Sequence, residues 1–549
     1  MEVTKGLRTV LLFCAASCAA SLYLGQDGNY DLRNYHIYNA WALLTGRWSQ
    51  DIFAAGGQTY FSPFLDVPYY LVARALFPSH GAYVVALAGL PYGALLFFIY
   101  LISGRIASCL ELGKWDRTGF VAACVLLAGT GAATWPMVGT TSNDITIAAM
   151  VLAAFHQILV GTSACDEAPW MRRVAIAGVL LGLATGLKLT AGVYVPSLAV
   201  VIFSVAQGSR NRIRSLAIFG GCVLALFVAI YGPWAWKLYE LTGNPFFPLL
   251  NGLFHSDWMK SIDVRDERFL PRSWAQWLFY PFYWSRLQSS LVTEVPFRDA
   301  RLAIAYLFLA GFAAIAFARK DLKTRWISGK YRAIHALVLF LVVSYIVWMR
   351  EFSIFRYLVA TECLAALFII IGIMAVVRGL GKRAAWMPAL CMVSIAGSIV
   401  AYNVNPTWGR APVGTDIFAV QAPRFERGAL VIFASQPMAF MAPGLAAAGE
   451  DLQFMTIPHG FSSGGQLGAD GFTHELGRRM QAKIAAHAQA LYVLFRKSDA
   501  PAESSLAAFR IETDVARCQP GRSPLGGEFF ACRGTYPKGK PATSALPAH

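Results

Sequence analysis

The chain has 549 residues, of which 56% are hydrophobic and 14% are charged, and its mean hydropathy is +0.49. Soluble proteins have nearly twice this share of charged residues, so the composition excludes a soluble globular protein. The formal net charge of +16 at pH 7 suggests nucleic-acid binding, but most basic residues lie in short loops between apolar runs. Basic loops of this kind orient membrane proteins, so the sequence predicts a polytopic membrane protein.

The N-terminal apolar run covers residues 10–24 and follows a stretch that contains Lys5 and Arg8. We predict a retained first span, because many more apolar runs follow it; a cleaved signal peptide is the alternative. Either arrangement places Asp31 outside the cytoplasm.

A polar but aromatic-rich stretch, residues 26–66, comes next and is too polar to cross a bilayer. From Asp31 its pattern is helical, with an apolar face that includes Trp41, and Gly46 ends the helix. This pattern predicts an amphipathic helix on the membrane surface with a carboxylate at its start. A second interfacial helix is expected at residues 67–77. An acidic group among aromatic rings suits chemistry on a lipid-linked substrate, and a simple helix cap is the alternative.

Apolar runs of roughly 15–25 residues, the length needed to cross about 30 Å of hydrocarbon, recur along the chain. The loops assigned to the cytoplasm are all basic, so the span count and the positive-inside rule agree. We predict about eleven transmembrane helices, at residues 8–24, 82–104, 119–137, 143–161, 173–187, 190–206, 215–236, 301–318, 333–349, 354–378 and 385–403.

Beyond the last predicted span the chain alternates short apolar strands with helical stretches. We therefore predict a transmembrane domain at 1–403, a small α/β periplasmic domain at 404–536 and a disordered tail at 537–549. The expected role of the α/β domain is docking or acceptor recognition, with structural support as the alternative. Its expected strands are 429–434 and 490–495, and its expected helices are 440–448 and 475–487.

Ten cysteines divide into two groups. Eight lie in or beside apolar runs and are expected to be small buried hydrophobic side chains. Cys518 and Cys532 lie close together in the polar C-terminal part, and such a pair in an oxidising compartment predicts a disulfide. No Cys/His spacing resembles a zinc site, so we expect no cofactor, and a divalent cation remains open.

Ionisable residues at the outer ends of the predicted spans give the strongest functional signal. Such residues are costly at membrane depth and usually mark a site. Asp144 begins the fourth span, Lys188 lies between the fifth and sixth, Arg350 precedes the tenth and Arg356 begins it. These residues are far apart in sequence, but the predicted topology places all of them at the same depth, at the outer face of the membrane. Two or three cations there would match a phosphate group.

Each of these residues also has an interpretation without chemistry. Asp144 would cap its helix, and Lys188 would extend along the bilayer to reach water. Arg350 and Arg356 would pair with an acidic neighbour, Glu351 or Glu362.

Several stretches together resemble the GT-C glycosyltransferases, membrane enzymes that use polyprenyl-phosphate-linked sugars. The resemblance is to a bacterial branch of that superfamily and covers most of residues 1–403. The similar stretches are Tyr-Asp-Leu-Arg-Asn-Tyr-His, Leu-Thr-Gly-Arg, Thr-Tyr-Phe-Ser-Pro-Phe-Leu-Asp, Gly-Leu-Lys-Leu-Thr, Thr-Gly-Asn-Pro-Phe-Phe-Pro and Ile-Phe-Arg-Tyr.

The resemblance implies an inverting transfer in which a carboxylate deprotonates the acceptor hydroxyl while the lipid phosphate leaves. The position that matches the general base is Asp31, but the first outside loop lacks an Asp-x-Asp or Glu-x-Asp pair, so Asp27 remains open. Lys188 and Arg356 would neutralise the phosphate without a metal. The remaining candidates are His36 for catalysis, Arg350 for phosphate binding, and Asp27, Tyr35, Tyr60, Asp144 and Tyr357 for substrate binding.

Two of these assignments have alternatives. The spacing from Asp31 to His36 resembles the Asp-to-His spacing of oligosaccharide-building members of the superfamily. The alternative is that His36 is an interfacial side chain with no role in chemistry. Asp66 in Phe-Leu-Asp-Val-Pro is interpreted as a helix cap.

The resemblance implies a multi-pass protein of the bacterial inner membrane whose active site faces the periplasm. The expected partners are a polyprenyl-phosphate-linked sugar, a glycan, lipid or protein acceptor and membrane lipid, but no nucleic acid. The alternatives are a transporter or flippase of a lipid-linked glycan and a membrane scaffold without catalysis. A transporter often has polar breaks near mid-membrane in two related halves, and no such repeat is visible in the sequence.

Overall fold

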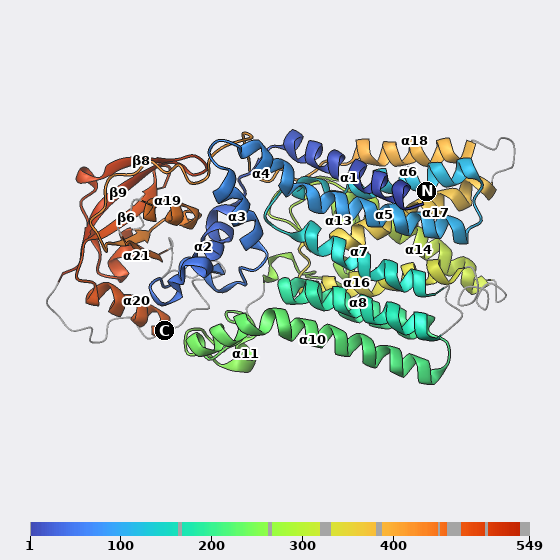
Figure 1. Ribbon diagram of the computed structural model, residues 1–549, viewed down its shortest axis with the longest axis horizontal. Helices are drawn as coiled ribbons and strands as arrows, with labels where there is room; N and C mark the ends of the chain where they lie inside the picture. The colour runs from blue at the N-terminus through green and yellow to red at the C-terminus, as the bar shows by residue number, and fades with distance from the viewer. Residues whose placement is uncertain are drawn as a thin grey trace. The chain divides into compact units, whose positions relative to one another are not determined.

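The chain folds into two compact units, each assembled from three segments that are separated in sequence (Figure 1). The first unit contains Met1–Leu24, Ala86–Tyr231 and Asp266–Trp408, and the second contains Gly25–Val85, Gly232–Arg265 and Gly409–His549. The structure, a computed structural model, describes residues 2–162, 167–261, 266–318, 331–379, 387–447, 451–457, 474–499 and 503–537.

The second unit joins the C-terminal residues to two earlier segments. A continuous domain at 404–536 therefore stays a prediction, as does a transmembrane domain that ends at 403. Of the predicted tail, 537–549, only Pro537 lies among the described residues.

A helix occupies each predicted span, because the apolar runs are long and contain few breaking residues. Seven of the described helices are long and apolar enough to cross a membrane. Four others at predicted spans do not meet the same measure, so the count of eleven stays a prediction. The helices are α1 (Glu2–Leu24), α5 (Leu90–Cys109), α6 (Lys114–Gly129), α7 (Asp144–Gly161), α8 (Glu167–Leu187), α9 (Tyr194–Val205), α10 (Ser209–Thr242), α14 (Arg301–Ala318), α16 (Arg332–Glu351), α17 (Val359–Gly379) and α18 (Met387–Tyr402).

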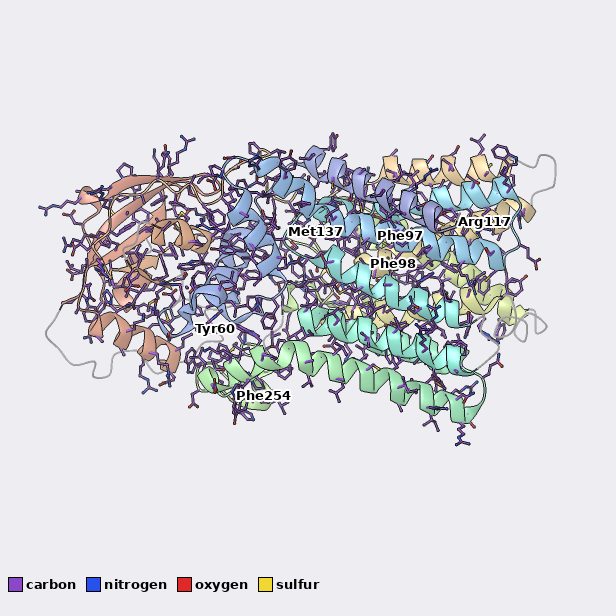
Figure 2. All side chains as sticks on the ribbon, in the orientation of Figure 1. Tyr60, Phe97, Phe98, Arg117, Met137 and Phe254 are labelled. Carbon is purple, nitrogen blue, oxygen red and sulfur yellow. A yellow bond between two sulfur atoms is a disulfide. The ribbon has the colours of Figure 1, made fainter. Side chains whose placement is uncertain are left out.

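Helix α17 lies at the centre of the bundle in the first unit. Its apolar window is 83% buried, whereas the corresponding window of α1 is only 11% buried. A helix that is apolar on all sides, as α17 is over most of its length, is expected in such a core. Side chains fill the spaces between the other helices; the ring of Phe98 on α5, for example, lies 6.3 Å from that of His156 on α7 (Figure 2).

Three glycines at four-residue spacing let α8 approach α10 closely. Gly178, Gly182 and Gly186 all face α10, and a Cβ atom added at any of them would lie within 3.0 Å of an α10 atom. Small residues at such spacing allow helix backbones to pack tightly in membranes.

The third predicted span, 119–137, is wrong at its C-terminal end. Helix α6 ends at Gly129, and a separate 3-10 turn follows at Trp135–Met137. The intervening residues turn because their backbone groups bind buried carboxylates, as Ala132 and Ala133 do with Asp299 and Glu362.

The second unit contains a mixed sheet in the strand order β5-β4-β6-β9-β7, with β8 paired to β9. Strand β4 is parallel to β5 and β6, and β9 runs antiparallel to β6, β7 and β8. The predicted small α/β part is therefore confirmed. Its elements are β4 (Leu430–Phe433), α19 (Ala442–Ala446), β5 (Gln453–Thr456), α20 (His474–Ala486), β6 (Leu491–Arg496), α21 (Glu503–Ala508), β7 (Glu512–Thr513), β8 (Gln519–Ser523) and β9 (Gly527–Thr535).

Cys518 and Cys532 form the predicted disulfide, with Cα atoms 4.2 Å apart. Cys518 directly precedes β8 and Cys532 lies within β9, so the bond joins the start of β8 to the middle of β9.

The predicted helix after Asp31 packs against this sheet. Helix α2 (Ile37–Thr45) ends at Gly46, whose φ of 69° is the left-handed conformation that glycine favours. All side chains from Ile37 to Ala42 are buried, and the Trp41 ring lies edge-on to Phe454 of β5 at 5.8 Å. Protein therefore covers Ile37 and Trp41 of the predicted apolar face, whereas Leu44 is 48% exposed, and the placement of α2 at a membrane surface stays a prediction.

Helix α3 (Asp66–Leu76) occupies the position of the second predicted interfacial helix. Tyr70 and Ala73 face the core of the second unit, whereas Leu71 is exposed. Its placement at a membrane surface stays a prediction.

A buried ion pair connects α2 to β5. The Arg47 guanidinium donates to both carboxylate oxygens of Asp51, at 2.8 and 3.0 Å, and also to the carbonyl of Leu452. Asp51 accepts two more hydrogen bonds, from the Tyr38 hydroxyl and the Phe454 backbone N–H, both at 2.8 Å. Burial raises the pKa of Asp51, and the bonds from Arg47 oppose that shift.

Removing Arg47 should therefore destabilise the second unit strongly. We expect Arg47→Met to lower the free energy of local unfolding of the second unit by about 3–5 kcal/mol, because Asp51 becomes a buried charge without its partner. Hydrogen exchange of peptides that cover β5 and α2 would measure the change. Arg478→Met is the control, since Arg478 pairs with Glu475 while largely exposed, and such surface pairs contribute about 1 kcal/mol or less. Equal effects of the two variants would contradict the prediction.

Candidate functional site

In the first unit, the structure brings Asp144 and Lys188 into direct contact. Asp144 is the first residue of α7, and Lys188 follows the end of α8. The Lys188 Nζ lies 2.5 Å from Asp144 Oδ1 and 2.7 Å from the carbonyl oxygen of Ser142. The Asp144 carboxylate thus pairs with Lys188 rather than capping α7, and the Lys188 ammonium ends in this ion pair instead of extending to water.

Arg356 and Tyr357 lie next to this pair, on a 3-10 turn at Phe355–Leu358. The Tyr357 ring centroid is 5.4 Å from both Lys188 Nζ and Arg356 Cζ, so one aromatic ring contacts two cations. The Tyr194 hydroxyl donates to the Tyr357 carbonyl at 2.7 Å and fixes the turn against α9.

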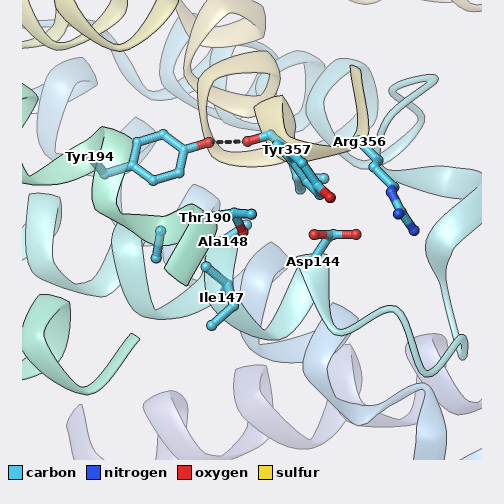
Figure 3. Close-up of a pocket in the computed structure, with 9 residues that line it drawn as sticks. Asp144, Ile147, Ala148, Thr190, Tyr194, Arg356 and Tyr357 are labelled. Carbon is cyan, nitrogen blue, oxygen red and sulfur yellow. Dashed lines mark hydrogen bonds between the residues drawn. The ribbon is translucent and has the colours of Figure 1, made fainter. Parts of the chain in front are cut away.

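Asp144, Tyr194, Arg356 and Tyr357 line one small cavity, which we call the cationic cavity (Figure 3). Its volume is about 10 Å³, about the space of one water molecule and far below the roughly 300–1,000 Å³ of sites that bury a whole small molecule. This space holds neither a phosphate group nor a sugar as it stands. The lining residues are Asp144, Ile147, Ala148, Thr190, Ala191, Tyr194, Arg356, Tyr357 and Val359.

The charge of the cationic cavity and its ion pair is net positive. Asp144 neutralises Lys188, and Arg356 adds one positive charge beside them. An anion with more than one oxygen would therefore be attracted, and guanidinium groups bind phosphate oxygens in a geometry that suits them.

Arg350, the third predicted cation, does not line the cationic cavity. It lies at the end of α16, its side chain is 77% exposed, and its Nε is 3.8 Å from Glu351. The pairing of Arg350 with Glu351 was one of the predicted alternatives and is confirmed.

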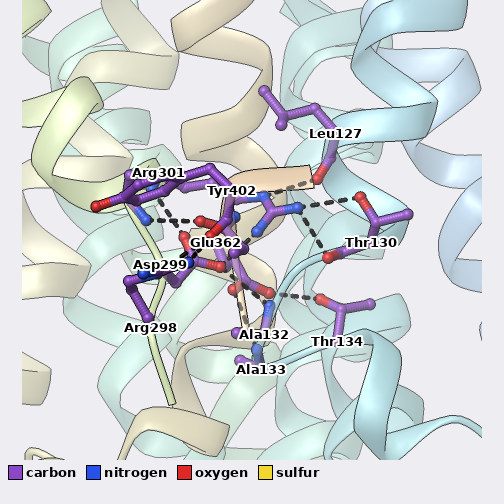
Figure 4. Close-up of polar contacts among 12 residues, drawn as sticks. Leu127, Thr130, Ala132, Ala133, Thr134, Arg298, Asp299, Arg301, Glu362 and Tyr402 are labelled. Carbon is purple, nitrogen blue, oxygen red and sulfur yellow. Dashed lines mark hydrogen bonds and ion pairs between the residues drawn. The ribbon is translucent and has the colours of Figure 1, made fainter. Parts of the chain in front are cut away.

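A second polar cluster in the first unit surrounds Arg301 (Figure 4). The guanidinium is fully buried and binds Asp299 and the backbone carbonyls of Leu127 and Thr130. Glu362 accepts hydrogen bonds from the Thr134 hydroxyl at 2.8 Å and the Ala133 N–H at 3.1 Å. The predicted pairing of Glu362 with Arg350 or Arg356 is therefore wrong, because its carboxylate holds the turn after α6.

In the second unit, Asp31 and His36 lie on one continuous helical stretch that contains a π turn at Leu32–His36. In a regular α-helix, residues five apart point about 140° away from each other. A π turn joins residues five apart by backbone hydrogen bonds, so it brings them to nearly the same side. The turn therefore places Asp31 and His36 on one face, and such turns are frequent at functional sites.

Asp66 binds His36. The Asp66 Oδ1 lies 2.6 Å from His36 Nδ1, and both side chains are more than nine-tenths buried. The Asp66 carboxylate thus bonds to the histidine ring, a contact that the cap interpretation does not predict. The Tyr35 ring lies beside the imidazole, with centroids 4.1 Å apart.

Asp27 occupies a more structural position than Asp31. It belongs to β1 (Gln26–Asp27), which pairs with β3 (Arg410–Ala411), and its Oδ1 accepts from the Asn29 N–H at 3.0 Å. Burial lowers the pKa of Arg410, and the charge of Asp27 opposes this shift.

Tyr60 packs inside an aromatic cluster. Its ring lies edge-on to Phe247 at 5.0 Å and to Trp258 at 6.0 Å, and only 3% of the residue is exposed. Its predicted role in substrate binding stays a prediction.

Among the described residues, no group of three or more His, Cys, Asp or Glu side chains is placed to hold a metal ion. A divalent cation therefore stays open, as it was from the sequence.

No protein-family model matches the chain, and no curated protein matches it. Among solved structures, ArnT from Cupriavidus metallidurans in the apo state is similar with a TM-score of 0.51 at 14% identity, over 95% of this chain and 97% of that chain. The chain has the fold of ArnT. The predicted helical membrane bundle is thus found as an ArnT-like fold, and with the seven apolar helices it indicates a multi-pass membrane protein.

Two further structures are similar at lower TM-scores. ArnT from Cupriavidus metallidurans bound to undecaprenyl phosphate has a TM-score of 0.48 at 14% identity, over 95% of this chain and 97% of that chain. The Archaeoglobus fulgidus oligosaccharyltransferase in complex with zinc and sulfate has a TM-score of 0.45 at 12% identity, over 88% of this chain and 68% of that chain.

Proposed function

We propose that the protein is an inverting glycosyltransferase that moves a sugar from a polyprenyl-phosphate donor to an acceptor at the periplasmic face of the bacterial inner membrane. The observation that supports this most is the cationic cavity, which Asp144 and Arg356 line and beside which Lys188 pairs with Asp144, in a chain with the ArnT fold. ArnT itself has been crystallised with undecaprenyl phosphate.

In the proposed reaction, Asp31 takes the proton of the acceptor hydroxyl. The hydroxyl oxygen forms a bond to the anomeric carbon while the bond from that carbon to the phosphate oxygen breaks. The leaving polyprenyl phosphate keeps the electron pair, and Arg356 and Lys188 stabilise its added negative charge. One displacement of this kind inverts the anomeric centre.

The proposed orientation places the C-terminal residues in the periplasm, where the Cys518–Cys532 disulfide would be stable. We propose acceptor recognition as the role of the α/β part. An active alkaline phosphatase fused after Pro537 would agree with this orientation, and an inactive phosphatase with a fluorescent GFP at the same point would contradict it.

Purified protein in lipid, supplied with a panel of radiolabelled polyprenyl-phosphate sugars and a lipid and glycan extract, tests the function. We expect the label to move to an acceptor in the extract and unlabelled polyprenyl phosphate to appear in equal amount. Movement of intact labelled lipid across the bilayer without any new product would favour the transporter or flippase instead. No turnover with any donor would contradict the transferase.

A further inference from the structure

The second nitrogen of the His36 ring is buried without a partner. Only 6% of the residue is exposed, and no described residue makes a hydrogen bond to Nε2. Buried polar atoms in proteins are nearly always hydrogen-bonded, so an unpartnered one indicates a group that binds there.

Asp66 determines what kind of group can bind. A carboxylate only accepts hydrogen bonds, so the 2.6 Å contact requires the His36 proton to lie on Nδ1. In the neutral ring Nε2 then has a lone pair and accepts a hydrogen bond. The Tyr35 ring, 4.1 Å from the imidazole, restricts rotation of the ring out of this orientation.

The π turn adds the second half of the arrangement. Because it brings Asp31 and His36 to one face, two hydrogen-bond acceptors, a carboxylate and an imidazole nitrogen, lie about one helical turn apart. Two acceptors at that spacing match two hydroxyl groups of one molecule. A serine or threonine acceptor, which has one O–H donor, would satisfy only one of them.

We propose that His36 Nε2 accepts a hydrogen bond from a second hydroxyl of the acceptor, beside the hydroxyl that Asp31 deprotonates, and that Asp66 is the residue that positions His36 for this contact. The acceptor is then a sugar or another polyol. This proposal rests on the proposed function. His36 removes no proton in this arrangement; it selects and orients the acceptor.

Transfer from the polyprenyl-phosphate sugar to a panel of short sugars, their deoxy analogues and serine- or threonine-containing peptides tests the proposal. We expect the wild type to use sugars, and to lose about tenfold in kcat/KM with the analogue that lacks the second hydroxyl, the effect of one hydrogen bond. His36→Asn and Asp66→Asn should raise the acceptor KM by a similar factor, leave the donor KM unchanged, and use both forms of the sugar equally.

Two variants separate this role from a structural one. His36→Gln places an amide near the position of Nε2 and should restore part of the discrimination between sugar and analogue, which His36→Asn does not. His80→Gln changes an exposed histidine of the same unit and should alter neither KM.

Nitrogen-15 spectra of the folded wild-type protein, labelled at histidine, read the tautomer directly. We expect the His36 proton on Nδ1; a proton on Nε2 in the neutral ring would overturn the proposal even if the variants do not fold. Unchanged acceptor KM and unchanged discrimination in folded variants would mean that Nε2 binds only an ordered water. Those results leave the transferase in place, whereas no transfer by the wild type to any acceptor would contradict the function itself.

Discussion

We expect Asp31→Asn to lower the rate of sugar transfer by about 10²–10⁴-fold, the usual loss when a positioned general base is removed. Asparagine keeps the size of the side chain and one acceptor oxygen, so the helical stretch that contains Asp31 should fold as before. It cannot take a proton at neutral pH, so the base function alone is deleted. Single-turnover rates with bound donor would measure the loss, and donor affinity should stay close to that of the wild type.

Asp27→Asn is the matched control. Asp27 holds the turn to Asn29 and lies in a strand pair with β3, so its replacement should affect the stability of the second unit more than the chemical step. If Asp31→Asn turns over normally and Asp27→Asn is inactive while folded, the base is Asp27. Normal activity of both variants would contradict the assignment of a base to this stretch and remove a main support of the enzyme proposal.

Arg356→Ala should weaken binding of the polyprenyl-phosphate donor by about 2–5 kcal/mol, if the guanidinium and the phosphate are both removed from water when they pair. The charges of Asp144 and Lys188 cancel each other in their ion pair. Arg356 therefore supplies the net positive charge of the cationic cavity. Equilibrium binding of labelled donor to protein in lipid would measure the change. Arg350→Ala is the control, because its side chain is 77% exposed and outside the cavity.

The role of Lys188 needs a double variant. Lys188→Met alone would leave the buried Asp144 carboxylate without its ion pair, and a loss of binding could then result from misfolding. Lys188→Met with Asp144→Asn removes both charges and should restore stability but not donor affinity. Wild-type affinity in the double variant and in Arg356→Ala would remove this cavity from the donor site.

The sequence predicts which charged residues lie at the same side of the membrane. Span lengths and basic loops determine which ends of the spans face that side. That argument gathered Asp144, Lys188 and Arg356, which the structure brings together. It failed for Arg350, since the level of a residue does not decide whether its side chain points into the bundle or away from it. The partner of Glu362 was missed for a similar reason: a turn of small residues gives no sign that its backbone binds a carboxylate.

The surroundings of α2 could not be predicted. An apolar stripe on a helix shows that something covers it, but a membrane and a protein core favour the same residues. The surface that covers Trp41 includes Phe454, far along the chain. The π turn before α2 has no recognised residue pattern, so neither the common face of Asp31 and His36 nor the contact with Asp66 could be derived from spacing.

The assembly of the second unit from distant segments has a consequence for its biosynthesis. Asp51 and Phe454, which share a hydrogen bond, are 403 residues apart. At about 5–20 residues per second, the ribosome needs roughly 20–80 s to reach Phe454 after completing Asp51. During that interval α2 has none of the sheet on which it packs, and every span between the two segments must be inserted before the sheet is made. A chain that terminates early would therefore contain Asp31, His36 and Asp66 and still be unable to bury the helix that presents them.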